Sequence, residues 1–314
     1  MAPTFDIDYV FPWVNDGDPV WRRIYEEYCI KTQSYLRLEQ FHNERFRDWG
    51  LLKYLFRAIE TNMPWIRKVH LIVSNIEQVP RWIDTDKVHI VLHSDIIPQK
   101  HLPTYNSTAI EMFIPFIDDL AEHFIYGNDD IFPFNPTQPS DWYTDSGVPK
   151  FQMRTLDAQT IKANQFRIVC SNQWWLLENL VTGKSHNRVF LRPQHGLNPM
   201  VKSKCIETQK LIGLPKIYKS ISNFRQAYNY NQYIYMDYMY LIGYYQNSEY
   251  TFEYKGASGF ELLDLIDNTT AQVLCINDCA SKLDSKQIVQ LQVLTAQKFE
   301  AKFPNKSKYE KEII

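Results

Sequence analysis

Phe124-Ile125-Tyr126-Gly127-Asn128-Asp129-Asp130 is an apolar run that ends on two adjacent carboxylates. The pattern predicts a buried strand that delivers its last side chains to the edge of a sheet. Asp129 and Asp130 are therefore candidate ligands for a hard divalent cation such as Mg²⁺, which takes oxygen ligands. Asn-Asp-Asp is also a common turn, because these side chains bond to nearby backbone, and taken alone the run is more often a turn than a metal site.

Strand and helix patterns alternate along the residues that precede this run. Strands are predicted at 7–14, 69–73, 88–92 and 124–126, and helices within 48–59 and 107–117, the second capped by Ser107. This order is typical of an α/β fold with a mostly parallel sheet. Ligands of such sheets bind beyond the carboxyl ends of the strands, so we expect the loops after Val14 and Tyr126 to face one crevice.

The chain beyond Pro149 is predicted to be mainly helical. Helices are expected at 172–180, 199–212, 229–245 and 285–303, and strands at 250–254 and 273–276. Pro199 is typical of a helix's first turn. The tyrosines of 228–245 are more typical of a core than of a sugar-stacking surface. The strand at 273–276 leads to Asn277-Asp278, so its end could converge with the strand end at Asp130. The lysine-rich segment after Pro304 is expected to be frayed.

Composition excludes several classes of protein. The chain has 314 residues, 45% of them hydrophobic, and a formal net charge of −2, so we expect a globular protein and no nucleic-acid partner. No apolar run approaches the roughly 20 residues of a spanning helix, and a signal-peptide pattern is missing, which predicts a cytoplasmic chain. Peripheral contact of the basic C-terminal tail with the inner face of a membrane is left open.

The five cysteines are odd in number and scattered, which argues against a disulfide framework. Cys275 and Cys279 have a spacing that zinc ligands can have. They lack a second Cys or His pair at a fitting distance along the chain, so we expect buried thiols.

Four separated blocks carry a family resemblance. They are residues 7–21, with Asn15 where Asp is usual; Arg45-Phe46-Arg47-Asp48 with 58–60, 64–68, 102–107, 109–111 and 128–130; 192–197 with 224–225 and 231–233; and 275–278. Together they resemble the Stealth proteins, sugar-1-phosphate transferases of microbial capsules and exopolysaccharides that are related to the lysosomal-enzyme N-acetylglucosamine-phosphotransferase. Each fragment is weak alone, and their joint occurrence is specific.

The resemblance implies a glycosyltransferase-A-like α/β fold with a mostly parallel sheet and a helical C-terminal half packed on it. It implies a single catalytic domain over 1–304, in which 1–149 bind the nucleotide sugar and 150–304 complete the site, followed by a charged tail at 305–314. The donor would be a UDP-hexose or UDP-N-acetylhexosamine. Its hexose 1-phosphate would pass to a hydroxyl group of a polysaccharide or lipid-linked oligosaccharide, and UMP would leave.

Two other functions remain open at this point. A metal-dependent glycosyltransferase of the same fold would use the same donor and release UDP. A carbohydrate-binding or assembly protein without catalysis would keep its role when His195 is replaced by alanine.

Transfer to a hydroxyl group requires neutralised phosphates, an aligned acceptor and a base. For neutralisation, the resemblance favours Mg²⁺ or Mn²⁺ held by Asp130 and Asp278, with Asp129 in reserve. Arg45 and Arg225 are the candidates for phosphate contacts, since a guanidinium can bind two oxygens at once. Asp278 could equally be a turn cap, and a surface salt bridge is the commoner fate of an arginine.

His195 is the candidate base because it lies in a Pro-Gln-His-Gly loop that matches the family's catalytic histidine region. His93 and His101 are weaker alternatives, and a lone loop histidine is more often structural. Asp48 could orient the cationic groups or bind sugar hydroxyls, as could Glu111. The loop from Trp13 would cradle uracil and ribose, although Trp13 could equally be core. The candidate substrate-binding residues are Trp13, Asp16, Asp18, Asn106, Glu111 and Asn128.

Overall fold

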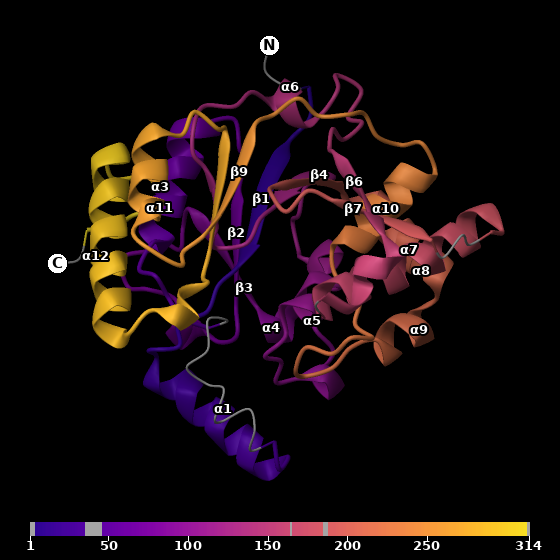
Figure 1. Cartoon of the computed structure of the whole chain (residues 1–314), viewed down its shortest axis with the longest axis horizontal. Helices are drawn as coiled ribbons and strands as arrows, with labels where there is room; N and C mark the ends of the chain where they lie inside the picture. Colours follow the sequence, from indigo (N-terminus) through magenta and orange to yellow (C-terminus); the bar gives the residue numbers. More distant parts are fainter. Residues whose placement is uncertain (1–3, 35–45, 164, 185–187, 313–314) are drawn as a thin grey trace. The chain divides into compact units, whose positions relative to one another are not determined.

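The computed structural model describes residues 4–34, 46–163, 165–184 and 188–312 (Figure 1). Contacts divide the chain into two compact units whose segments alternate along the sequence. Unit 1 comprises residues 1–10, 91–126 and 138–249, and unit 2 comprises residues 11–90, 127–137 and 250–314. The expectation of a single catalytic domain stays a prediction. Within the described ranges, no helix is both long and apolar enough to cross a membrane.

The largest sheet has five strands in the order β3-β2-β1-β4-β8. Its strands are β1 (Ile7–Pro12), β2 (Val69–Val73), β3 (Val88–Leu92), β4 (His123–Tyr126) and β8 (Asn198–Val201). Val10 lies opposite Tyr126 where β1 and β4 run parallel, and β8 runs antiparallel to β4. All residues of β2 are buried, as are the last three of β4, which explains why apolar residues predominate in both strands. The predicted α/β class is confirmed.

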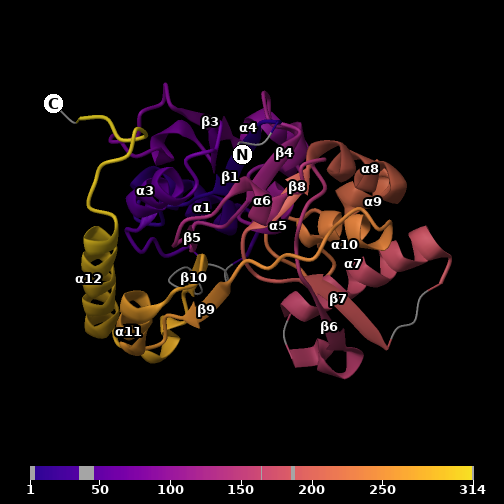
Figure 2. The same cartoon turned by 90° about the horizontal axis from the view of Figure 1, so that it is seen from above.

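Unit 1 adds helices and a hairpin to β4 and β8. The helices are α4 (His93–Ile96), α5 (Ser107–Glu111), α6 (Pro139–Trp142), α7 (Gln165–Thr182), α8 (Lys202–Ile212), α9 (Leu214–Lys219) and α10 (Tyr233–Leu241), and the antiparallel hairpin is β6 (Met153–Asp157) with β7 (Val189–Pro193). Helix α10 packs against α7 and α8 (Figure 2). Tyr233 and Tyr235 are fully buried, so these tyrosines of α10 are core residues, as predicted.

Unit 2 contains a second, three-stranded sheet in the order β5-β10-β9. The strands of this sheet are β5 (Ile131–Pro133), β9 (Phe252–Gly256) and β10 (Val273–Asn277). The α-helices of unit 2 are α1 (Pro19–Lys31), α3 (Leu52–Asn62), α11 (Glu261–Asn268) and α12 (Ser285–Lys302). Strand β10 runs antiparallel to β5 and parallel to β9, with Cys275 opposite Ile131. Helices α11 and α12 lie side by side (Figures 1 and 2).

The helix predicted from Pro199 begins later than expected. Asn198–Val201 forms β8, and α8 starts only at Lys202. Pro199 lies opposite Ile125 of β4, and β8 is the last strand in its sheet. A proline, which lacks a backbone N–H, is tolerated on such an edge strand, so strand pairing overrides the local helix signal.

The C-terminal segment is packed rather than frayed, and that prediction was wrong. Tyr309 is 2% exposed, and its carbonyl accepts a hydrogen bond of 2.8 Å from the backbone N–H of Asp84. Glu310 accepts two hydrogen bonds from the buried Arg57, at 2.8 Å and 3.0 Å. The segment therefore closes over α3 with buried side chains between its exposed lysines.

Candidate active site

Five carboxylates of unit 2 form what we call the acidic cluster: Asp16, Asp48, Asp129, Asp130 and Asp278. Asp129 and Asp130 lie in the turn between β4 and β5, and Asp278 follows β10. The N–H of Ile276 donates to the carbonyl of Asp130 at 2.8 Å, so the ends of the two strands lie side by side, as the sequence suggested. Asp16 follows β1, and its carboxylate accepts a hydrogen bond from the N–H of Asp48 at 3.3 Å.

Electrostatics couple the members of the acidic cluster. Burial raises the pKa of Asp129 to about 8, with repulsion from Asp130 and Asp48 adding to the effect. Burial raises the pKa of Asp130 to about 6, helped by the charge of Asp278 and opposed by hydrogen bonds. The pKa of Asp48 is raised by burial and then by Asp16. The loops after β1 and β4 thus contribute to one group of carboxyls, of which Asp48, Asp129 and Asp130 resist ionisation when nothing compensates their charge. That the two loops face one crevice stays a prediction.

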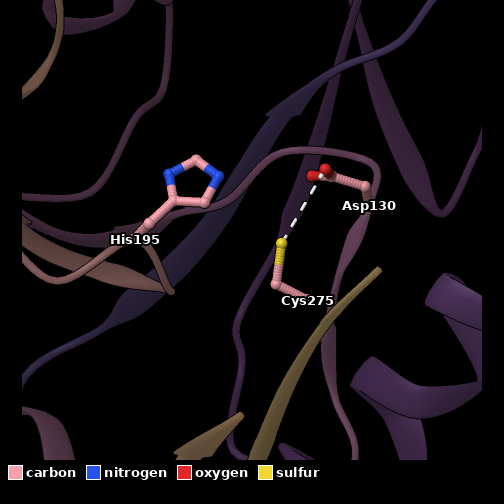
Figure 3. A group of neighbouring side chains, drawn as sticks. All are labelled: Asp130, His195 and Cys275. Carbon is pink, nitrogen blue, oxygen red and sulfur yellow. Dashed lines mark hydrogen bonds between the residues drawn. The ribbon is translucent and has the colours of Figure 1, made fainter. Parts of the chain in front are cut away.

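The carboxyl group of Asp130 fits a divalent cation. The thiol of the buried Cys275 donates to Oδ2 at 3.8 Å, as Figure 3 shows. Oδ1 is buried and has no hydrogen-bond partner among the residues that the structure describes. A buried carboxylate oxygen without a partner is costly, and an oxygen-seeking cation would satisfy it.

The carboxylate of Asp278 is already compensated. Arg47 Nη1 donates to both of its oxygens, at 3.0 Å and 2.8 Å, and Trp49 Nε1 donates to Oδ2 at 2.9 Å. The N–H of Ala280 donates to Oδ1 at 3.0 Å. A cation bound by Asp278 would therefore share the carboxylate of Asp278 with Arg47. Arg47 is a residue that sequence reasoning passed over in favour of Arg45, which lies outside the described residues.

Several predicted substrate-binding residues have local structural roles. Trp13 is 6% exposed and belongs to the core. Asp18 caps α1, accepting from the N–H of Val20 at 2.9 Å, and its other oxygen accepts from Gln78 Nε2 at 2.6 Å. The carbonyl of Asn128 accepts from the N–H of Ile131 at 3.1 Å, which closes the turn before β5. Contact of these side chains with a nucleotide stays a prediction.

His195 lies in unit 1, in the loop between β7 and β8. Its Nδ1 is 2.8 Å from the hydroxyl oxygen of Tyr233. Burial, together with the positive charges of Arg192 and Arg225, lowers the pKa of His195 to about 4. The imidazole is therefore neutral near pH 7 and able to accept a proton.

Arg225 lies beside the first turn of α5. Its Nη2 donates to Ser107 Oγ at 2.5 Å. Its charge also opposes the burial that raises the pKa of Glu111. Glu111 is 4% exposed and accepts hydrogen bonds from the N–H of Gln232 at 3.0 Å and from the Tyr126 hydroxyl at 3.4 Å. Glu111 therefore holds the start of α10 in addition to any role toward a sugar.

The remaining predicted residues of unit 1 are structural in their contacts. Asn106 rather than Ser107 caps α5, accepting from the N–H of Thr108 at 3.1 Å, and it is 2% exposed. His93 is buried, which lowers its pKa to about 4. Burial also lowers the pKa of His101. Unit 1 holds Asn106, Glu111, His195 and Arg225, and unit 2 holds Trp13, Asp16, Asp18, Asp48, Asn128, Asp129, Asp130 and Asp278.

Comparison with known proteins gives a family match. Residues 45–151 match the model of conserved region 2 of the Stealth proteins. This region includes Asp48, Glu111 and the turn at 128–130, so the resemblance seen in the sequence blocks is confirmed.

Curated relatives carry consistent names. The exopolysaccharide phosphotransferase cps2G of Lactiplantibacillus plantarum is 41% identical over 149 residues, 46% of this chain and 42% of that protein. The receptor polysaccharide phosphotransferase WefC of Streptococcus oralis is 31% identical over 215 residues, 66% of this chain and 62% of that protein. The capsular polysaccharide phosphotransferase LcbA of Aeromonas hydrophila is 36% identical over 162 residues, 51% of this chain and 44% of that protein. The matches to these three relatives thus span between 42% and 62% of their lengths.

A solved structure also matches over most of the chain. The galactosyltransferase LgtC, in complex with donor and acceptor sugar analogues, aligns with 92% of this chain and 95% of its own, at a TM-score of 0.42 and 11% identity.

Proposed function

We propose that this protein transfers hexose 1-phosphate from a UDP-hexose or UDP-N-acetylhexosamine to a hydroxyl group of a polysaccharide or lipid-linked oligosaccharide. The reaction would serve capsule or exopolysaccharide synthesis. The observation that carries the proposal is the match of residues 45–151 to a Stealth region, together with relatives named as polysaccharide phosphotransferases. A cytoplasmic location, at the inner face of the membrane when the acceptor is lipid-linked, belongs to the same proposal.

A divalent cation, Mg²⁺ or Mn²⁺, is part of the proposal. Asp130 would hold it, with Asp129 and Asp278 as further ligands. The raised pKa values of Asp129 and Asp130 and the partnerless Oδ1 of Asp130 support this assignment. When bound, such an ion supplies charge neutralisation to a diphosphate and its leaving group.

The proton step is assigned to His195. The acceptor oxygen would form a bond to the β-phosphorus, the bond from that phosphorus to the UMP oxygen would break, and His195 would take the hydroxyl proton. Arg225, with Arg45, would bind phosphate oxygens as the charge shifts toward UMP. Asp48, Glu111 and the loop from Trp13 to Asp18 would position the donor, with Asn106 and Asn128 near it.

The nucleotide product tests the proposal. The purified protein is incubated with UDP-sugars, Mg²⁺ or Mn²⁺ and glycan acceptors, and UMP is separated from UDP. Acceptor-dependent UMP that disappears with EDTA supports phosphosugar transfer. Acceptor-dependent UDP would contradict it and favour the glycosyltransferase alternative.

A pair of matched variants tests the assignment of the cation site. Asp130→Asn should lower the rate of UMP release by at least about 100-fold, because a metal-bound charge is lost at the phosphates. Asp86→Asn removes an exposed carboxylate of the same unit and should leave the rate unchanged. Equal activity of Asp130→Asn and the wild type would contradict the assignment.

A further inference from the structure

The hydrogen bond between His195 and Tyr233 bears on the proton step. Nδ1 of His195 and the hydroxyl oxygen of Tyr233 are 2.8 Å apart. A neutral imidazole carries one proton, on Nδ1 or on Nε2, and a tyrosine hydroxyl can donate or accept. The direction of this hydrogen bond therefore decides which nitrogen of His195 keeps a lone pair.

Only one direction is compatible with a base at Nε2. When Nδ1–H donates to the phenol oxygen, Nε2 has a lone pair that can take a proton. When the phenol donates to Nδ1, Nε2 carries the proton and can only donate. The lowered pKa of His195, about 4, keeps the ring neutral near pH 7, so the ring exists as one of these two tautomers.

Tyr233 is held in place by its burial and its contacts. It is fully buried at the first residue of α10, and its N–H donates to Asn231 Oδ1 at 3.1 Å. Its ring packs edge-on against Phe166, with ring centroids 5.8 Å apart and planes at 74°. Phe166 also contacts His195 edge-on, with centroids 6.3 Å apart. The phenol oxygen is thus held beside His195 by the packing of the ring and by the start of α10.

We propose that Tyr233 is a positioning residue that accepts a hydrogen bond from Nδ1–H of His195 and so leaves Nε2 unprotonated as the base. The proposal rests on the proposed function, because it concerns the proton that His195 takes from the acceptor hydroxyl. In that step the acceptor O–H bond breaks, the proton forms a bond to Nε2, and the resulting imidazolium keeps donating from Nδ1 to Tyr233.

The first test reads the tautomer without substrate. In protein labelled with ¹⁵N-histidine, long-range proton–nitrogen correlation spectra distinguish a protonated from an unprotonated ring nitrogen, and His195→Gln identifies the resonances. At pH 7 we expect the proton on Nδ1 in the wild type. Tyr233→Phe should shift the population toward Nε2–H. A wild-type spectrum with the proton on Nε2 would overturn the proposal.

Tyr235→Phe is the matched control. It removes another buried hydroxyl of α10, one that donates to the carbonyl of Met112 at 3.1 Å and accepts from Gln209 Nε2 at 2.7 Å. We expect this variant to keep the wild-type tautomer of His195. A tautomer change in both variants would show a general loosening of α10 and would contradict a specific role of Tyr233.

Kinetics supply the second test. Tyr233→Phe keeps the packed ring and should lower kcat for UMP release by about 10- to 100-fold, with little change in the KM of the donor. Enzyme molecules in which His195 carries its proton on Nε2 bind the donor but do not react. Unchanged kcat would count against the proposal. If the tautomer is as expected and the wild type yields no acceptor-dependent UMP, the proposed function fails while the assignment of Tyr233 stands.

Discussion

Two neighbouring carboxyl groups, Asp129 and Asp130, have raised pKa values of about 8 and about 6 because of burial and the negative charges around them. The folded protein therefore binds protons more tightly than the unfolded chain, whose aspartates titrate near 3.8. Stability must then fall as the pH rises from about 4 toward the raised values. A cation bound as proposed would remove this penalty by compensating the two negative charges.

Asp129→Asn should stabilise the metal-free protein at neutral pH. In EDTA at pH 7.5 we expect the free energy of unfolding to increase by about 1 to 2 kcal/mol, or the Tm by a few degrees. Asparagine does not ionise, so the variant lacks the cost of burying a group that is ionised in the unfolded chain. The gain should shrink as the pH approaches 4, where the carboxyl of Asp129 is protonated in the folded state. Thermal unfolding at both pH values measures it, with Asp86→Asn as the control. A gain of equal size at pH 4 would disprove the electrostatic explanation.

Arg47→Ala should destabilise the metal-free protein. The side chain of Asp278 is only 8% exposed, and Arg47 makes two of its hydrogen bonds. Removing one partner of a buried pair leaves an uncompensated charge, so we expect a loss of about 2 to 3 kcal/mol by chemical denaturation. Lys298→Ala, which breaks the exposed ion pair with Asp267, should cost less than about 1 kcal/mol. Equal losses would show that the pair with Asp278 is solvated like a surface pair.

The same pair shows what sequence reasoning misses at this scale. The carboxylate at 278 was predicted from the strand that precedes it, but its partner Arg47 lies 231 residues away in the sequence. No local pattern identifies which of several arginines reaches a given carboxylate. The Tyr233 hydroxyl beside His195 was missed for the same reason.

Elements with strong local signals were predicted well. Strands β2 and β3 have the predicted bounds, because each is a short run that is rich in β-branched residues and apolar apart from one histidine. Helix α12 starts and ends within one residue of the prediction. Its capping box at Asp284 fixes the start, and Pro304 lies just beyond its end.

Elements that depend on distant partners were predicted less well. The helix expected over 107–117 is interrupted after Glu111, and a 3-10 turn, Ile114–Phe116, follows around Pro115. The hairpin of β6 and β7 has partly exposed strands, so it lacks a clear apolar run. Strand β8 exists because β4 pairs with it, and that pairing leaves no mark in its own sequence.

The C-terminal segment should contribute stability as an element. Ending the chain at Pro304 removes the bonds from Arg57 to Glu310 and the buried Tyr309. We expect a loss of about 3 to 5 kcal/mol in urea denaturation, because Arg57 is buried and keeps only part of its hydrogen bonding. Lys306→Ala changes an exposed side chain of the same segment and should stay within about 0.5 kcal/mol of the wild type. A truncated protein as stable as the full chain would restore the expectation of a frayed tail.

At the scale of the whole molecule, the sequence indicated the class but not the division of the chain. Unit 2 comprises residues 11–90, 127–137 and 250–314. The short segment that contains β5 belongs to unit 2 although the residues on both sides of it belong to unit 1, and local periodicity does not reveal this. The acidic cluster could be anticipated, because strand ends followed by Asp are visible in the sequence. The roles of its members in catalysis stay predictions, which the chemistry of the product must decide.

The most direct measurement follows the β-phosphorus of the donor. The UDP-sugar is labelled radioactively at that phosphorus and incubated with the protein, a divalent cation and a glycan acceptor. We expect the label to enter the glycan as a phosphodiester while unlabelled UMP is released. Label that stays in the nucleotide product as UDP, with sugar alone in the glycan, would contradict it.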